Sequence, residues 1–206
     1  MTISKKQPTL WLDFETKSKT DLTLHGLQRY LEDPTTAALC LGWAFDEEPA
    51  QVWFAPDPFP KEITERMANP ALRYIAHNAS FDRGIWDYVL SPDYELPNPH
   101  LTQWQCSAAR AMAHGLPAKL ALLGDALNLK IKKNPDGTRL INLYSKNGGR
   151  PWEGNDKYLM GEYCKDDVEA MRYACTFLRE LTPSEHAEYH ENERINERGI
   201  PVDVAF

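Results

Sequence analysis

The segment TLWLDFETKS, residues 9–18, constrains the fold more than any other, because it is an apolar strand that ends in acids. Thr9–Phe14 is apolar enough to be buried, and Asp13 and Glu15 stand two residues apart at its end. Side chains two apart on a strand point to the same face, so the two carboxylates should lie together. They repel each other unless they share a proton or a cation. Magnesium or manganese, which favour oxygen ligands, would relieve that repulsion. A solvated strand end explains an isolated pair of this kind equally well.

Around this strand the chain reads as strands first and mostly helices later, while residues 128–150 carry turn signals without strong periodicity. This order predicts an α/β domain with a mixed β-sheet flanked by helices. Further strands are expected at Ala38–Phe45, Gln51–Ala55 and Leu72–Ala76. Helices are expected at Leu24–Leu31, Lys61–Asn69, from an N-cap at Asn78 through Leu90, Thr102–His114, Pro117–Leu127, Asp156–Leu181 and from Thr182 to Gly199.

The length and the cysteines limit the class of protein. The 206 residues suffice for one large domain or two small ones. The four cysteines include no C-x-x-C pair and no zinc-finger spacing, which predicts reduced thiols in a cytoplasmic protein. The N-terminus lacks the apolar stretch of a signal peptide, and no run approaches the roughly 18 apolar residues of a membrane helix. We therefore expect a soluble, intracellular protein with no membrane partner.

The net charge is −7, which argues against a simple nucleic-acid coat, since such a protein would be basic. It does not exclude a nucleic-acid enzyme. A site that collects carboxylates for cations looks acidic in a charge count and becomes attractive to phosphate once the metals bind.

A second acid occurs in IAHNASFDRGIW, where a strand runs into a helix. Asp82 then lies in the first turn of that helix. The helix dipole alone favours an acid at this place, so Asp82 in isolation needs no further role.

A third group occurs in GEYCKDDVEA. Tyr163 and Asp167 are four residues apart and share one helix face, where a phenol and a carboxylate could hold a water and a metal. Asp166 points about a quarter-turn away and is expected to face solvent. An ordinary amphipathic helix with surface acids is the alternative explanation.

In this order the three groups read D-x-E, N-x-x-x-D and Y-x-x-x-D, and this pattern resembles that of the DEDDy exonucleases. The resemblance is strongest to the 3′→5′ proofreading domain of family A (pol I-type, phage-like) DNA polymerases. It extends over nearly the whole chain, through the segments AHNASFD, CSAARAMAHGLPAKLALLGDAL, YCKDDVEA and ERINERGIPVDV. A close subgroup has His five residues before the last Asp; here that position is Glu162, so the tyrosine type is expected.

The resemblance implies a ribonuclease H-like fold and two divalent metal ions, Mg²⁺ or Mn²⁺. Carried over by motif, Asp13, Glu15 and Asp167 would hold the first metal. Asp13 would bridge to the second, which Asp82 would support through water, and Tyr163 would orient the attacking water. The implied activity is hydrolysis of single-stranded or frayed DNA 3′ ends to 5′-mononucleotides, as in proofreading, in a bacterial or phage-infected cell.

An unpaired strand end needs stacking surfaces and basic flanks. Phe81, beside Asp82, is the best stacking candidate, although a core aromatic would look the same. Thr16 and Asn78 could bind the terminal nucleotide. A local excess of cations could track the phosphate backbone, although a solvated loop explains it as well; its members are Lys130, Lys132, Lys133, Arg139, Lys146 and Arg150.

Two other functions compete with this one. An RNase D-like RNA exonuclease shares the same plan of acids, but ERINERGIPVD resembles the junction that leads into a polymerase domain. A catalytically silent nucleic-acid-binding domain would typically have lost an acid, and all four are present. We therefore expect an exonuclease domain at residues 1–181. Residues 182–206 are expected to form a helix and turn leading to a polymerase domain that this chain does not contain.

Overall fold

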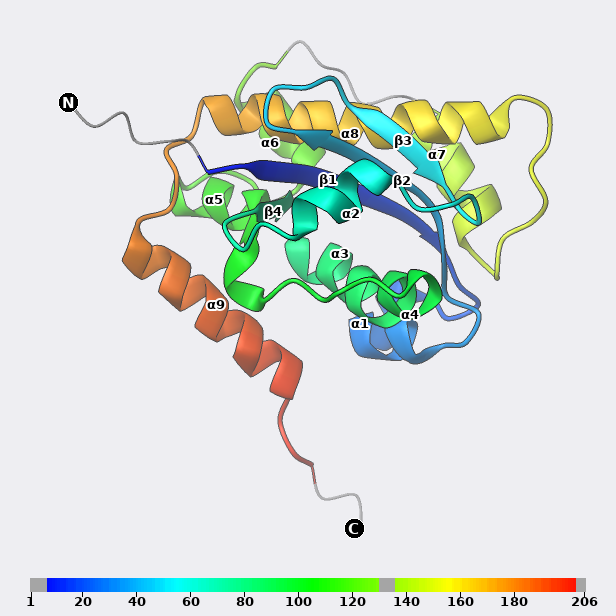
Figure 1. The fold of residues 1–206 in the computed structure, drawn as a ribbon, viewed down its shortest axis with the longest axis horizontal. Helices are drawn as coiled ribbons and strands as arrows, with labels where there is room; N and C mark the ends of the chain where they lie inside the picture. Colours follow the sequence, from blue (N-terminus) through cyan, green and yellow to red (C-terminus); the bar gives the residue numbers. More distant parts are fainter. Residues whose placement is uncertain (1–6, 130–135, 203–206) are drawn as a thin grey trace.

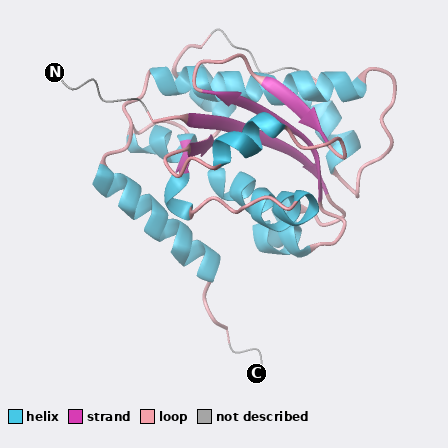
Figure 2. Ribbon diagram, in the orientation of Figure 1, coloured by secondary structure: helices cyan, strands magenta, loops and turns pink. Residues whose placement is uncertain are grey.

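The computed structural model describes residues 7–129 and 136–202. A five-stranded sheet in the order β3-β2-β1-β4-β5 is covered by helices on both faces (Figures 1 and 2). The mixed α/β sheet expected from the sequence is confirmed. The strands are β1 (Thr9–Lys17), β2 (Ala37–Phe45), β3 (Gln51–Phe54), β4 (Arg73–Ala76) and β5 (Trp104–Cys106).

Strand β1 lies at the centre of the sheet and carries the first acidic motif. It pairs antiparallel with β2, where Asp13 faces Gly42, and parallel with β4. The register of β1 against β2 shifts between Glu15 and Thr16, as in a β-bulge. Leu10, Leu12 and Phe14 alternate with the acids and are buried in the main core. The opposite faces of one strand therefore serve the core and the acids.

The helices form two layers. On one face, α8 (Asp156–Thr176) lies across β2, β1 and β3, as Figure 1 shows. On the other face, α3 (Ala79–Ile85) packs against β1, β4 and β5. The remaining helical elements are α1 (Leu22–Glu32), α2 (Lys61–Met67), the π-helix η1 (Trp86–Leu90), α4 (Ser91–Tyr94), the 3₁₀ turn η2 (Leu101–Gln103), α5 (Ser107–Ala113), α6 (Leu120–Ala126), α7 (Gly137–Leu140), the π-helix η3 (Ile141–Ser145) and α9 (Pro183–Arg198).

The local structure differs from the expectations in four places. Residues 104–106 form β5 rather than the start of a helix, because they extend the sheet beside β4 and bury Trp104 and Cys106. Asn78 precedes α3 in the left-handed conformation, at φ 65°, and its side chain caps no backbone group. Residues 137–145, where the sequence shows no strong periodicity, form the helical segments α7 and η3. The long helix also ends at Thr176 instead of Leu181.

The last helix matches its sequence signals. Thr182 accepts a hydrogen bond from the Glu185 backbone N–H, and the Glu185 side chain accepts one from the Thr182 N–H, so the pair forms a capping box. Pro183 occupies the first turn, and the helix ends before Gly199. His190 links α9 to β5 and Glu193 links it to α3, and Figure 1 shows its C-terminal end pointing away from the sheet.

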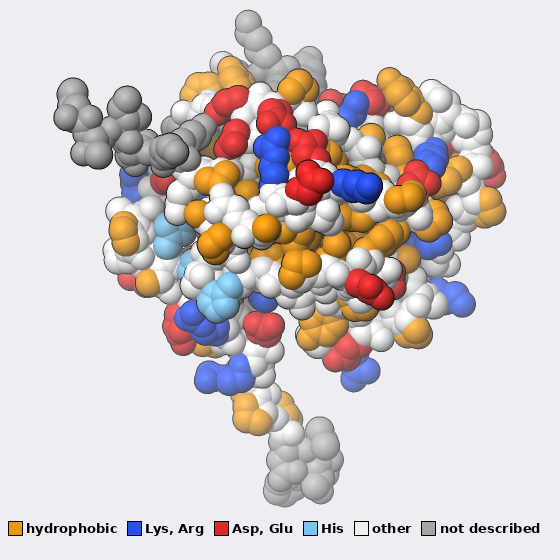
Figure 3. Space-filling view, in the orientation of Figure 1, with side chains coloured by type: hydrophobic (Ala, Val, Ile, Leu, Met, Phe, Trp, Pro, Cys, Tyr) orange, Lys and Arg blue, Asp and Glu red, His pale blue; other side chains and the backbone are white. Residues whose placement is uncertain are grey.

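All four cysteines are free and buried. Among the described residues, no helix is long and apolar enough to cross a membrane. On the face shown in Figure 3, acidic and basic side chains are interspersed rather than gathered into one broad patch of a single sign.

Candidate active site

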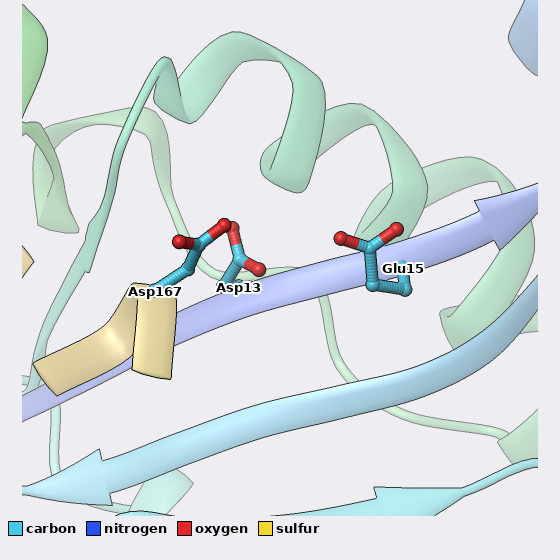
Figure 4. A group of neighbouring side chains, drawn as sticks. All are labelled: Asp13, Glu15 and Asp167. Carbon is cyan, nitrogen blue, oxygen red and sulfur yellow. The ribbon is translucent and has the colours of Figure 1, made fainter. Parts of the chain in front are cut away.

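Three carboxylates converge where α8 crosses the central strand. Oxygens of Asp13, Glu15 and Asp167 all lie within 4.8 Å of one another, a spacing that could hold a metal ion. Figure 4 shows Asp13 and Glu15 rising from the same face of β1, with Asp167 reaching Asp13 from α8. The alternation of the strand thus places two acids together, and a helix more than 150 residues later brings the third. Asp166, the neighbour of Asp167, is not among the three.

A glycine in β2 permits this close crossing of α8. A Cβ added to Gly42 would lie 2.7 Å from the carbonyl oxygen of Cys164, which is three residues before Asp167. The Gly42 N–H donates to the Cys164 sulfur at 3.0 Å, and the Cys164 thiol donates to the Asp13 carbonyl oxygen at 3.1 Å. These contacts join α8, β2 and β1 directly beneath the carboxylates. They fix the distance between the first and the third motif.

Burial and mutual repulsion disfavour the ionised form of these carboxylates when no cation is bound. The pKa of Asp13 is raised well above its ordinary value, first by burial and then by the charges of Asp167, Asp82 and Glu15. Burial and the neighbouring negative charges therefore both disfavour the ionised form of Asp13. A divalent cation would supply the missing positive charge.

Asp82 occupies a buried place beside this group. Its side chain is 1% exposed, and it accepts the Phe14 backbone N–H at 3.0 Å. Burial raises its pKa to about 8, although the hydrogen bond from Phe14 opposes the rise. Asp82 is not one of the three acids whose oxygens lie within 4.8 Å of one another, yet its charge acts on Asp13. Its position fits an indirect contribution to a metal better than a direct one.

Tyr163 projects from α8 one turn before Asp167. Its ring is buried, and its hydroxyl forms a hydrogen bond with Asp167. Burial, followed by the charge of Asp167, raises the pKa of the phenol, so it stays protonated at neutral pH. A Cβ on Gly137 would collide with the ring, so α7 packs tightly behind it. The ring is therefore held in place by a segment that the sequence did not predict to be helical.

The expected nucleotide contacts gather in a cavity of about 500 Å³ beside the carboxylates. Thr16 is buried, and its hydroxyl is 2.7 Å from the Tyr30 hydroxyl. Phe81 packs against the Tyr30 ring with centroids 6.1 Å apart. Asn78 lies exposed at the border of the cavity. Asp13, Glu15 and Asp82 belong to the same lining, together with Lys19 and Lys146, of which sequence reasoning missed Lys19.

The expected basic track is only partly present. Arg139 donates two hydrogen bonds to Asp156, and Arg150 is paired with Glu153, so both guanidinium groups form ion pairs with acids beyond residue 150. Lys146 is exposed and lines the cavity. Three further expected members, Lys130, Lys132 and Lys133, lie outside the described residues.

His77, the residue before Asn78, connects three segments of the fold. The two ring nitrogens of His77 lie 2.8 Å from the Ser107 hydroxyl and 2.6 Å from the Ala118 carbonyl oxygen. The ring thereby ties the end of β4 to the start of α5 and to the loop before α6.

Comparison with known proteins gives two matches of different kinds. No family model matches the chain. A DNA polymerase of Bacillus phage SP02 is 30% identical over 216 residues, which cover 95% of this chain and 32% of the polymerase. The chain therefore spans about a third of that relative. A solved structure described as the apo form of the nuclease has a TM-score of 0.53 at 14% identity, covering 98% of this chain and 90% of the other.

At that identity the solved nuclease shows the fold alone, which is the ribonuclease H-like α/β fold expected from the motifs. The phage polymerase supplies the likeness in sequence, and its matching region is the N-terminal part. From its fold, its sequence and its three acidic motifs, the chain resembles the exonuclease domain of a DNA polymerase.

Proposed function

We propose that this chain is a metal-dependent 3′→5′ exonuclease that shortens single-stranded or frayed DNA 3′ ends to 5′-mononucleotides, as a proofreading domain does. The observation that carries the proposal is the convergence of Asp13, Glu15 and Asp167 beside a cavity large enough for a small ligand. The likeness to a phage DNA polymerase supports DNA as the substrate and a polymerase domain as the partner in a longer protein.

The donor set fits hard divalent cations. Carboxylate oxygens are the ligands that Mg²⁺ and Mn²⁺ prefer, and a cation would offset the burial and the neighbouring charges that raise the pKa of Asp13. Asp13, Glu15 and Asp167 would hold one ion; Asp13 and, through water, Asp82 would hold a second. Two such ions, when bound, lower the pKa of water and stabilise charge on the attacking and leaving oxygens of a phosphodiester.

The side chains of the protein would orient the substrate. The Tyr163 hydroxyl, which hydrogen-bonds Asp167, would position the attacking water without holding a metal. Phe81 would stack on the terminal base, while Thr16 and Asn78 would bind its sugar or phosphate. An unpaired end is required, because the acids are half-buried beside a cavity and a duplex end would have to open before entering it.

The two competing functions remain distinguishable. An RNase D-like exonuclease would use the same acids, so only the likeness to a DNA polymerase favours DNA. A silent binding domain would not need the acids to converge, and the three that could hold a metal are brought together in this chain.

Incubation with a 5′-labelled single-stranded DNA tests the proposal. The expected result is a ladder of shortened, still labelled strands in Mg²⁺ and none in EDTA. Immediate release of the label as a mononucleotide would mean the opposite polarity. An RNA strand of the same sequence is the matched substrate, and faster shortening of the RNA would favour the RNase D-like function instead.

A further inference from the structure

A second cavity lies on the other side of the carboxylates. Its volume is about 670 Å³, and its lining includes Asp13 and Asp167. It shares Asp13, His77 and Asn78 with the first cavity, so the two meet at the acids. The first cavity holds the residues proposed to bind the terminal nucleotide. The proposed function gives the second cavity no role.

One wall of the second cavity is the last helix, α9. Tyr189, Asn192 and Asn196 are spaced three and four residues apart and line the cavity from one face of that helix. Both asparagine side chains belong to exposed residues, so their amides can reach a ligand. The opposite wall includes Lys119 at the start of α6, which is also exposed. Amide donors and acceptors on one side and a cation on the other suit a polar, negatively charged ligand.

Buried polar contacts hold α9 in this place. The Glu193 carboxylate, 5% exposed, accepts the Ser80 hydroxyl at 2.7 Å and lies 3.7 Å from the Arg83 guanidinium. Ser80 and Arg83 flank Asp82 on α3. His190, also buried, lies 2.9 Å from the Trp104 carbonyl oxygen of β5. The negative charge of Glu193 is thus compensated within the protein, and α9 forms a fixed wall beside the acids.

We propose that the second cavity binds the DNA single strand on the 5′ side of the scissile phosphate, with Asn192, Asn196 and Lys119 as its contacts. This inference rests on the proposed function. If the terminal nucleotide fills the first cavity and its 5′-phosphate lies over the acids, the preceding nucleotides continue beyond the acids, where the second cavity begins. The amides contact phosphate or base-edge atoms, and Lys119 contacts a phosphate.

Two substrates separate the two cavities. The p-nitrophenyl ester of thymidine 5′-monophosphate carries a terminal nucleotide and the scissile phosphate, but no nucleotide on the 5′ side. A thymidine octanucleotide carries both parts. In the double variant Asn192→Ala, Asn196→Ala, the KM for the octanucleotide relative to that for the ester should rise about tenfold, as expected from the loss of two ordinary hydrogen bonds. Asn142→Ala removes an exposed amide outside both linings and should leave the ratio unchanged.

The possible outcomes bear on different claims. Hydrolysis of both substrates with an unchanged KM ratio in the double variant would overturn this inference and leave the proposed function standing. If the second cavity instead holds the released mononucleotide, thymidine 5′-monophosphate should inhibit the double variant less than the wild type, and the KM ratio should be unchanged. That result would also overturn this inference. If the wild-type chain hydrolysed neither substrate in Mg²⁺, the proposed function would fail and this inference with it.

Discussion

Replacing Gly42 by alanine tests whether the close crossing of α8 over β2 sets the geometry of the site. The added Cβ would lie 2.7 Å from the Cys164 carbonyl oxygen and 2.9 Å from its carbon. Both are backbone atoms and cannot rotate away. Gly42 is also held on both sides, by pairing with Asp13 and with Val52, so β2 has little freedom to retreat.

The magnitude follows from this contact. Ordinary van der Waals separation begins near 3.4 Å, so the helix must move away by about 0.7 Å. Overpacking of a core typically costs about 1–3 kcal/mol in the free energy of unfolding. The same shift moves Asp167 away from Asp13, and a displacement of this size at a reacting centre can lower the rate by about 10²-fold.

Urea unfolding and the rate of DNA hydrolysis measure both effects. Gly124→Ala in α6 is the matched control, because a Cβ there meets nothing within 4 Å. It should stabilise the protein by about 0.5–1 kcal/mol, through helix propensity, and leave the rate unchanged. A Gly42→Ala variant that unfolds at the wild-type urea concentration and hydrolyses DNA at the wild-type rate would refute the reasoning.

Four other outcomes are expected. Tyr163→Phe should lower turnover by about 10²–10³ with metal affinity unchanged, whereas a fully active variant would reduce the tyrosine to a packing residue. In EDTA, the free energy of unfolding should fall as pH rises from about 4 through 8. Burial raises the carboxyl pKa values of Asp13 and Asp82, so the folded state binds more protons than the unfolded state over this pH range. Mg²⁺ at 100 times its dissociation constant should raise the melting temperature by about 5–10 °C at neutral pH, and a melting curve insensitive to Mg²⁺ would argue against a resident ion. A mismatched primer end should be hydrolysed faster than a paired one, since unpairing costs a few kcal/mol, and equal rates would speak against an unpaired substrate.

The first motif could be understood from the residues alone. Alternation along β1 places Asp13 and Glu15 on one face, and the structure has them there. The meeting of Asp167 with them was expected only from the resemblance to exonucleases. No local pattern can show that a helix 150 residues away crosses this strand, because that approach depends on Gly42 and on the contacts of Cys164.

The errors in the fold share a physical cause, which is tertiary contact acting on short segments. Residues 104–106 are too few to show a strand period, and their pairing with β4 decides their conformation. Arg139 and Arg150 read as free cations in the sequence, but Asp156 and Glu153, which pair with them, lie beyond residues 130–150. No sequence motif indicates that α9 lies beside the acids, because α9 comes after the last of the three acidic motifs. The division of the chain at residue 181 stays a prediction.

Calorimetric titration with Mn²⁺ tests the central claim most directly, because the account rests on carboxylates that converge to hold metal ions. The wild-type chain should bind two ions. Asp13→Ala should bind neither with measurable affinity, since Asp13 is proposed to contact both. Asp166→Ala, which removes the neighbouring acid outside the group of three, should bind two ions as the wild type does. A wild-type chain that binds no Mn²⁺, or an Asp13→Ala variant that binds as the wild type does, would contradict the account.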